Sequence, residues 1–442
     1  MKTGPNSSIL RAVFLTTFLD LVGFSIIFPL FPQLLNYYLT LEGEQSLIGA
    51  LVRNLRAFAG DGHDAEFLTV VLFGGVLGSL YSILQFVCAP IWGTISDRYG
   101  RRTTLIFTIT GTLLSYVCWV FAKNFLILII ARLIGGIMAG NISTASAVIA
   151  DSTTPKDRSK GMAVIGIAFG IGFVIGPAFG GAASFVDLTQ LWPEGKALGL
   201  NPFSFAALIA LFLSTINLFY VVTKLPETHP PENRGKAQLT RTANPMKLFR
   251  NSGGPGVRRT NLLSFFFLTA FSAMEFTLVF LTVERFEFTP RHNAGMFVFI
   301  GFVIALVQGG AVRRIAPKRG EKPLVIGGLV AIFPGFILIG VSNSVAILFL
   351  GLALMAAGSA FANPCLSGLI SRYSSEEHQG FALGLFRSVG ALSRAIGPII
   401  GGAMYWKYGA TSPYLLGAVL IWIPIMIAIG LPNPPETVES GH

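Results

Sequence analysis

Charged side chains are scarce in this sequence. Asp, Glu, Lys and Arg together make up 12% of its 442 residues, whereas hydrophobic residues make up 52% and the mean hydropathy is +0.67. Soluble globular domains carry about 25% charged residues. The deficit excludes a soluble globular protein and predicts a chain that lies in a lipid bilayer.

Cysteine and histidine are also scarce, and their positions exclude several kinds of site. The three cysteines lie within apolar runs, where none can form an extracellular disulfide, and the five histidines lie outside the interior of such runs. No Cys/His cluster has the spacing of metal ligands, and no nucleophile–base or nucleotide-binding constellation occurs. We therefore expect no metal, no cofactor and no enzymatic activity.

The excess of basic residues has a topological explanation. The net charge is +11, but the basic residues fall in short loops between apolar runs, which argues against a nucleic-acid partner. About 22 of the 32 Lys and Arg lie on the side of the two termini, and about 7 lie in the opposite loops. By the positive-inside rule, both termini are expected in the cytoplasm, at the plasma membrane or an organelle membrane.

Twelve apolar runs are long enough to cross a bilayer, whose core of roughly 30 Å needs about 20 residues of helix. They lie near residues 12–38, 68–91, 103–122, 125–150, 161–185, 202–223, 261–283, 292–312, 323–341, 345–371, 380–406 and 412–431. The first run continues past Pro29 without a small-residue cleavage site, so we expect no cleavable signal peptide. The sequence predicts an all-α polytopic membrane protein.

A sequence segment recurs half a chain length apart, which indicates that the chain contains two similar halves. The segment Gly176–Gly181 in the fifth run reads GPAFGG, and Gly397–Gly402 in the eleventh reads GPIIGG, 221 residues later and therefore half of the 442-residue chain apart. We expect two six-helix halves, residues 1–223 and 261–442, joined by a basic cytoplasmic linker at 224–260, in a monomer with a central cavity. Rocking of two such halves is the basis of alternating access. The long outer loop from about 40 to 67 is either a solvated cap or a gating element.

The segment from Gly93 to Arg102, GTISDRYGRR, resembles the signature loop of the major facilitator superfamily. We expect a tight cytoplasmic turn in which a glycine permits the bend and the charged residues form ion pairs. The resemblance implies a gate in which Asp97 locks the outward-facing state against the start of the eleventh helix near Gly380. The gating candidates are Gly93, Asp97, Arg98, Gly100, Arg101, Arg102, Asp151 and Arg158. The second half keeps a basic remnant in its corresponding segment, 310–322, with Arg313 and Arg314 where an acid would fall, so we expect no matching lock there.

Glycines in the fifth run resemble the antiporter signature of the drug–proton branch of this superfamily. Small residues at this spacing allow helices to approach closely, and a proline bends the helix. The packing candidates are Gly172, Gly176, Pro177, Gly180 and Gly181, with Gly397 and Pro398 in the second half.

Five ionisable residues lie well inside the apolar runs, where a charge costs roughly 2.5–3.5 kcal/mol or more and is by default functional. They are Asp20, Arg132, Glu275, Arg387 and Arg394. Asp20 and Arg132 match the first-helix and fourth-helix motifs of tetracycline-type antiporters. We expect Asp20 and Glu275 to border a central cavity and to carry protons, because desolvation favours a neutral carboxyl while a nearby arginine favours the ionised form. A static buried ion pair is the alternative.

Four polar residues within the runs are weaker candidates for the cavity: Gln85, Asn141, Gln308 and Asn363. Hydrogen bonding between helices is their other expected role. Three arginines against two acids favour an anionic substrate, and Arg394 lies too deep to reach the membrane surface.

The resemblance to this branch covers most of the chain. It implies proton-coupled antiport, an efflux of small organic molecules among which organic anions are favoured, with the bilayer, protons and a small organic anion or drug-like molecule as partners. The ninth run, 323–341, contains no acid where bacterial tetracycline exporters have one, which argues against tetracycline itself. Two alternatives stay open: an uncoupled facilitative transporter, and a non-transporting receptor or chaperone.

Overall fold

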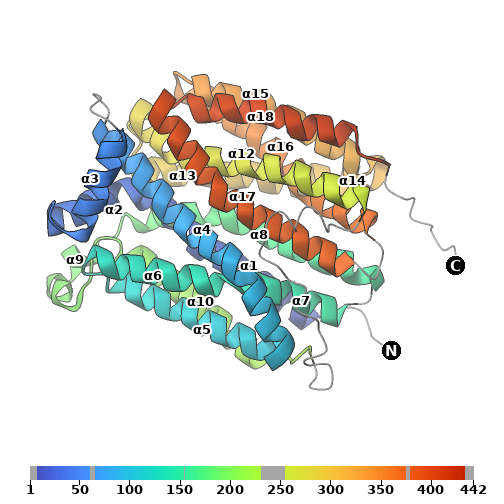
Figure 1. Cartoon of the computed structure of the whole chain (residues 1–442), viewed down its shortest axis with the longest axis horizontal. Helices are drawn as coiled ribbons and strands as arrows, with labels where there is room; N and C mark the ends of the chain where they lie inside the picture. The colour runs from blue at the N-terminus through green and yellow to red at the C-terminus, as the bar shows by residue number, and fades with distance from the viewer. Residues whose placement is uncertain (1–6, 60–64, 154, 230–253, 375–378, 434–442) are drawn as a thin grey trace.

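The computed structural model describes residues 7–59, 65–153, 155–229, 254–374 and 379–433, and these form an all-helical bundle of two halves (Figure 1). Eleven helices within the described residues are long and apolar enough to span a membrane. The predicted fifth span corresponds to α8, many of whose side chains lie outside the described part.

The first half contains α1 (Ser7–Ser25), η1 (Phe28–Leu30), α2 (Phe31–Glu42), α3 (Leu47–Ala59), α4 (Ala65–Tyr99), α5 (Arg101–Val120), α6 (Phe125–Met138), η2 (Ala139–Asn141), α7 (Ile142–Ser152), α8 (Pro155–Ala183), α9 (Leu188–Leu191), η3 (Pro193–Leu198) and α10 (Ser204–Lys224). The second half contains α12 (Pro255–Phe286), α13 (Pro290–Leu306), the π-helical η5 (Val307–Val312), α14 (Arg313–Arg319), α15 (Glu321–Val341), α16 (Val345–Tyr373), α17 (Gln379–Tyr408) and α18 (Ser412–Ile429). Helix α12 begins six residues before the seventh span was expected.

We call the end of the bundle at which α1 begins and α18 ends the terminal end, and the opposite end, which carries α3, the far end (Figure 1). Hydrogen bonds tie helix ends together at the terminal end. The Ser8 hydroxyl donates to the carbonyl of Lys224 (3.1 Å), and Arg259 donates to the carbonyl of Gly430 (2.9 Å). Each half therefore joins its first and last helices in the same way.

The predicted first span is two helices rather than one. Pro29 lies in η1, between α1 and α2, where its missing N–H and fixed φ interrupt the α-helical hydrogen bonds. The loop expected after this span also contains a helix, α3, whose apolar and polar residues segregate to opposite sides. The long outer loop is thus partly a helix that contacts α4 at the far end.

Glycines allow the helices of each half to touch along their backbones. In the first half, a Cβ on Gly172, Gly176 or Gly180 of α8 would lie 1.9–2.9 Å from the carbonyl oxygens of Phe18 and Val22 of α1 and of Ile26 just after it. In the second half, a Cβ on Gly401 of α17 would lie 2.8 Å from the carbonyl of Ala273 of α12. The packing role expected for these glycines agrees with this geometry.

The two halves contact each other at the far end. A Cβ on Gly181 would lie 2.5 Å from the Cβ of Ala294, across the α8–α13 contact. The rings of Phe31 and Phe276 lie 6.4 Å apart between their centroids, also across the halves. Close apolar packing therefore closes the far end.

Candidate functional site

A cavity of about 1100 Å³, which includes space open to solvent, lies in the second half. Its walls come from α12, α13, η5, α16 and α17, and most of the lining side chains are apolar. Aromatic rings and thioethers supply much of this surface: Phe271, Phe297, Phe386, Met274 and Met355. Such walls suit the apolar body of a small organic molecule.

Three of the predicted ionisable residues line this cavity: Glu275 on α12, and Arg387 and Arg394 on α17. The two arginines are seven residues apart, which places them on one face of α17 about 10.5 Å apart along the axis. Gly390 lies between them, and a Cβ there would be 3.5 Å from Nη1 of Arg394. The absence of a side chain at Gly390 leaves room beside the guanidinium.

Glu275 and Arg394 are buried and lie within electrostatic range of each other. The Glu275 Oε2 atom has no hydrogen-bond partner among the described residues. Arg387 lies over the ring of Phe386, 5.4 Å from its centroid. Its side chain lines the cavity.

Two of the four weaker candidates also line the cavity. Gln308 enters it from η5, where the π-helical turn interrupts the α-helix, and Asn363 enters from α16. With Ser272 and Ser359 they supply the neutral hydrogen-bonding groups of the lining. The cavity therefore combines apolar walls, two cations, one acid and a few polar contacts.

Asp20 and Arg132 do not line this cavity, which corrects the expectation that Asp20 borders it with Glu275. Both residues are buried inside the first half, where Asn141 lies beside Asp20. The guanidinium of Arg132 stacks on the ring of Tyr81 at 4.6 Å, and its Nη2 approaches the Phe24 carbonyl at 3.5 Å. The rings of the first half enclose these charges.

Tyrosines complete this first-half cluster, and sequence reasoning missed them. The Tyr116 hydroxyl packs against the backbone of Gly23, since a Cβ there would lie 1.6 Å from it. The hydroxyl of Tyr81 and one oxygen of Asp20 have no hydrogen-bond partner among the described residues. Gln85 donates to the carbonyl of Ala139 (3.2 Å) and so joins α4 to η2, as expected of an interhelical contact. Tyr81 and Tyr116 each lie within an apolar run, and a polar hydroxyl at such a position is the sequence feature that could have identified them.

The segment Gly93–Arg102 is mostly helical, which corrects the expectation of a loop. Residues through Tyr99 form the end of α4, and α5 begins at Arg101. Only Gly100 breaks the helix, with a φ of 103° that favours glycine, as expected. The turn is therefore a single residue between two long helices.

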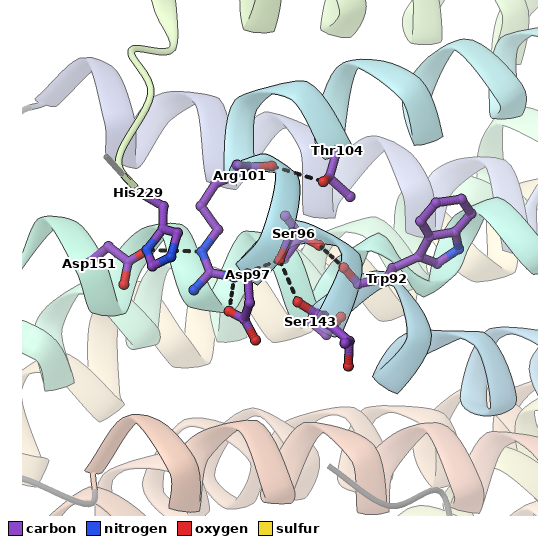
Figure 2. Close-up of polar contacts among 12 residues, drawn as sticks. Trp92, Ser96, Asp97, Arg101, Thr104, Ser143, Asp151 and His229 are labelled. Carbon is purple, nitrogen blue, oxygen red and sulfur yellow. Dashed lines mark hydrogen bonds and ion pairs between the residues drawn. The ribbon is translucent and has the colours of Figure 1, made fainter. Parts of the chain in front are cut away.

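Charged residues around this turn form a network at the terminal end (Figure 2). Arg101 pairs with Asp97, and its Nε donates to Asp151 on α7 (2.9 Å). Glu227 accepts from the backbone N–H of Arg101 (2.9 Å), and the His229 ring lies 3.7 Å from Asp151. The network ties α4, α5, α7 and the residues after α10 together.

The remaining gating candidates lie around this network. Arg102 donates to the Val222 carbonyl (2.6 Å), whereas Arg98 is exposed and lies over the Tyr99 ring. Gly93 is buried near the end of α4. Helix α17 begins at Gln379, beside the predicted start near Gly380, whereas the side chains of Arg158 and of residues 379–381 lie outside the described part of the chain.

The second half contains an ion pair that the sequence analysis missed. Arg372 at the end of α16 donates to Glu321, the first residue of α15, at 2.7 Å. The repeat of 220 residues places Pro317 at the position of Asp97, where the lock was expected to need an acid, and Glu321 at the position of Arg101.

Comparisons with known proteins agree with this architecture. The family model described as Major Facilitator Superfamily matches residues 13–340 and 314–441. Bovine major facilitator superfamily domain-containing protein 10 is 36% identical over 459 aligned residues, which cover 99% of this chain and 96% of the relative. The class C tetracycline resistance protein of Escherichia coli is 28% identical over 350 residues, 78% of this chain and 84% of that protein. The crystal structure of the human organic anion transporter MFSD10 (TETRAN) has a TM-score of 0.79 at 34% identity, covering 96% of this chain and 100% of that chain.

Proposed function

The chain belongs to the Major Facilitator Superfamily and is a membrane transporter, and from that premise we propose that it exports small organic anions in exchange for protons. The observation that carries the proposal is the second-half cavity, where apolar walls surround Arg387 and Arg394. A guanidinium binds a carboxylate in a bidentate manner, while aromatic and aliphatic walls bury the apolar part of the same molecule. The solved human relative is described as an organic anion transporter, which supports this substrate class.

Proton exchange is assigned to Asp20 in the first half. Asp20 is buried and does not line the cavity, so the proton and the substrate bind to different groups of the protein. If the transporter switches its opening to one side with the anion bound and Asp20 ionised, and back again with the anion released and Asp20 protonated, each cycle exchanges an anion for a proton. Rocking of residues 1–223 against 261–442, with both termini in the cytoplasm, is the motion that we propose.

One contact favours a second candidate, proton–anion cotransport. Glu275 lies within electrostatic range of Arg394 inside the cavity. A proton on Glu275 removes a negative charge from the site and leaves Arg394 to bind an anionic group, so proton and anion bind together there. This coupling has the opposite sign to exchange through Asp20.

Reconstitution into liposomes separates these functions. The purified protein is tested with a panel of aromatic carboxylates and organic cations, with an imposed pH gradient and a pH-sensitive dye in the lumen. Protons moving against the anion, with the gradient effect lost in Asp20→Asn but kept in Glu275→Gln, support exchange. Protons moving with the anion, with the effect lost in Glu275→Gln, support cotransport. Anion flux indifferent to the gradient in the wild type overturns both coupling schemes, and flux of the cations alone overturns the substrate class.

A further inference from the structure

The first half has a hollow of its own, away from the cavity described above. It measures about 700 Å³, a volume that includes open space, and lies between α1, α8 and α10, which contact one another. We call it the α1 groove. None of its lining residues is acidic, and all but one cation and one phenol are apolar: Leu10, Arg11, Phe14, Leu15, Val164 and Tyr220.

The α1 groove opens onto the surface that faces the acyl chains of the bilayer. Ile167, one turn from Val164 on α8, is 45% exposed, and Phe219, next to Tyr220 on α10, is 69% exposed. In a membrane-spanning bundle, exposed apolar side chains of this kind contact lipid tails, because no water reaches that depth. The molecules that surround the groove are therefore lipids.

Charge and apolar surface are ordered along the groove as they are along a phospholipid. The Ser8 hydroxyl donates to the Lys224 carbonyl (3.1 Å), which sets the start of α1 level with the end of α10 at the terminal end. Arg11 lies about 4.5 Å further along α1, and Phe14 about 4.5 Å beyond it. Tyr220 lies one turn deeper than Lys224. The cations are thus at the level of lipid headgroups, and the apolar lining is at the level of acyl chains.

Two cations at the mouth of the groove are available to an anion. Arg11 and Lys224 are exposed, and neither side chain forms a hydrogen bond or ion pair with a described residue. Lys224 follows Tyr220 by four residues, which places both side chains on one face of α10. Basic residues at this level attract anionic lipids, and a phosphate accepts charge-assisted hydrogen bonds from both kinds of cation. Charge complementarity therefore favours an anionic headgroup.

Two hydrogen bonds set the spacing of α1 and α10 beside the groove. One is the bond from Ser8 to Lys224, and the other is donated by the hydroxyl of Thr16 to the side-chain oxygen of Asn217 (3.0 Å). Thr16 and Asn217 are buried, and Thr16 lies about 12 Å along α1 from Ser8. Both bonds and all the lining residues belong to the first half. Motion of one half against the other therefore does not take the groove apart.

We propose that the α1 groove binds an anionic phospholipid. Its phosphate lies between Arg11 and Lys224, and the hydroxyl of Tyr220 donates to a headgroup oxygen. One acyl chain lies along the groove against Phe14 and Leu15. The site is separate from the substrate cavity, and the inference depends only on the position of the chain in a bilayer, not on the substrate or the coupling ion.

Lipid preference tests the charges. The protein, purified in a detergent that removes weakly bound lipid, is titrated with dioleoyl phosphatidylglycerol or dioleoyl phosphatidylcholine, and the first bound lipid is measured by native mass spectrometry. We expect the anionic lipid to bind at least fivefold more tightly, and Arg11→Gln with Lys224→Gln to reduce that preference below twofold. The control Lys196→Gln with Lys407→Gln removes two exposed cations at the far end and should keep the preference (Figure 1). Equal binding of the two lipids by the wild type, or a preference that survives in the Arg11 and Lys224 variant, overturns the proposal.

A bulky side chain tests the groove itself. Val164→Trp fills it, whereas Ile167→Trp adds the same ring to the exposed surface one turn away on α8. We expect Val164→Trp to weaken phosphatidylglycerol binding at least fivefold and Ile167→Trp to weaken it less than twofold. If Val164→Trp does not elute as a monodisperse species, Leu15→Trp takes its place.

Three outcomes overturn the site. The first is unchanged lipid binding by the folded groove-filling variant. The second is displacement of the lipid by an equal concentration of glycerophosphoglycerol, because that molecule has the headgroup but no acyl chains. The third is a wild-type protein that elutes as a dimer and binds no lipid, which would assign the groove to a second copy of the chain. None of these outcomes affects the anion proposal, because no readout involves the cavity arginines.

Discussion

The two halves share a scaffold and differ in what they enclose. In both, a glycine-bearing helix packs on the backbone of the first helix of the half, α8 on α1 and α17 on α12. The first half covers Asp20 and Arg132 with Tyr81 and Tyr116, whereas the second half opens a cavity onto Glu275 and two arginines. The same helix arrangement thus encloses a polar cluster in the first half and surrounds a cavity in the second half.

This difference teaches that helix packing and interior chemistry are set by different residues. Substituting the glycines would separate the helices in either half, because no side chain fits between the backbones. The charges project from other faces, and large side chains decide whether they reach a cavity. The predictions below test the division of roles between the halves.

The largest effect is expected from removal of both cavity arginines. Arg387→Gln with Arg394→Gln should lower kcat/KM for an aromatic carboxylate by about 1000-fold, equivalent to about 4 kcal/mol, because the anionic group loses both cationic partners. The control Arg387→Lys with Arg394→Lys keeps the charges and should lose only about tenfold. Initial rates in proteoliposomes measure both, and a double glutamine variant within threefold of wild type would contradict the site.

Helix packing in the first half should tolerate an added methyl group less well than helix packing in the second half. A Cβ on Gly180 would lie 1.9 Å from the Ile26 carbonyl, whereas one on Gly401 would lie 2.8 Å from the Ala273 carbonyl. Gly180→Ala should therefore destabilise the protein by about 3 kcal/mol and Gly401→Ala by about 1 kcal/mol. Thermal unfolding in detergent measures the difference. Gly384→Ala is the control, because no atom lies within 4 Å of the added methyl group.

Substituting the two buried carboxyls one at a time should separate proton coupling from substrate binding. Asp20→Asn should reduce flux driven by a pH gradient about tenfold and change KM less than twofold, because Asp20 does not line the cavity. Glu275→Gln should instead change KM, since Glu275 does line it. Concentration series with and without the gradient give both values. Equal changes in KM for the two variants would remove the distinction between the halves.

Loss of the Asp97 charge should affect turnover more than affinity. Asp97→Asn weakens the pair with Arg101 at the terminal end, away from the cavity, so we expect a fall of about fivefold in kcat with little change in KM. Lys407→Gln is the control, because Lys407 is exposed, lies over the Tyr408 ring and is not a gating candidate. A loss of substrate affinity alone in Asp97→Asn would rule out a gating role.

The smallest effect is expected at Tyr81. Tyr81→Phe keeps the ring beneath Arg132 and removes a hydroxyl that has no described partner, so transport should change less than twofold. Tyr81→Leu removes the ring and should lower the free energy of unfolding by about 1 kcal/mol, measured by thermal unfolding in detergent. Equal effects of the two substitutions would point to the hydroxyl rather than the ring.

Much of the helical architecture was predictable from hydrophobic run length, because a bilayer requires helices of a minimum length. The seven-residue spacing of Arg387 and Arg394 is in itself enough to place both on one face of a helix. Helix boundaries were less predictable. The end of the second apolar run at residue 91 and the resemblance to a signature loop predicted a loop at Gly93–Arg102, yet α4 continues through Pro90 to Tyr99.

The enclosure of Asp20 was not predictable from its own neighbours in sequence. The rings around this cluster come from α4 and α5, which lie far along the chain and meet α1 only in the folded bundle. Glu321 was missed for a different reason. An acid was expected at the position equivalent to Asp97, whereas Glu321 stands at the position equivalent to the cation Arg101, 220 residues later.

The most direct test of the division between the halves compares the two buried arginines. Equilibrium binding of a labelled aromatic carboxylate to the purified protein is measured for Arg394→Gln and Arg132→Gln, each shown to elute as a folded monodisperse species. We predict that Arg394→Gln raises Kd at least tenfold and that Arg132→Gln leaves it within twofold of wild type. A larger rise in Kd for Arg132→Gln, or equal rises for both, would contradict a substrate site confined to the second half.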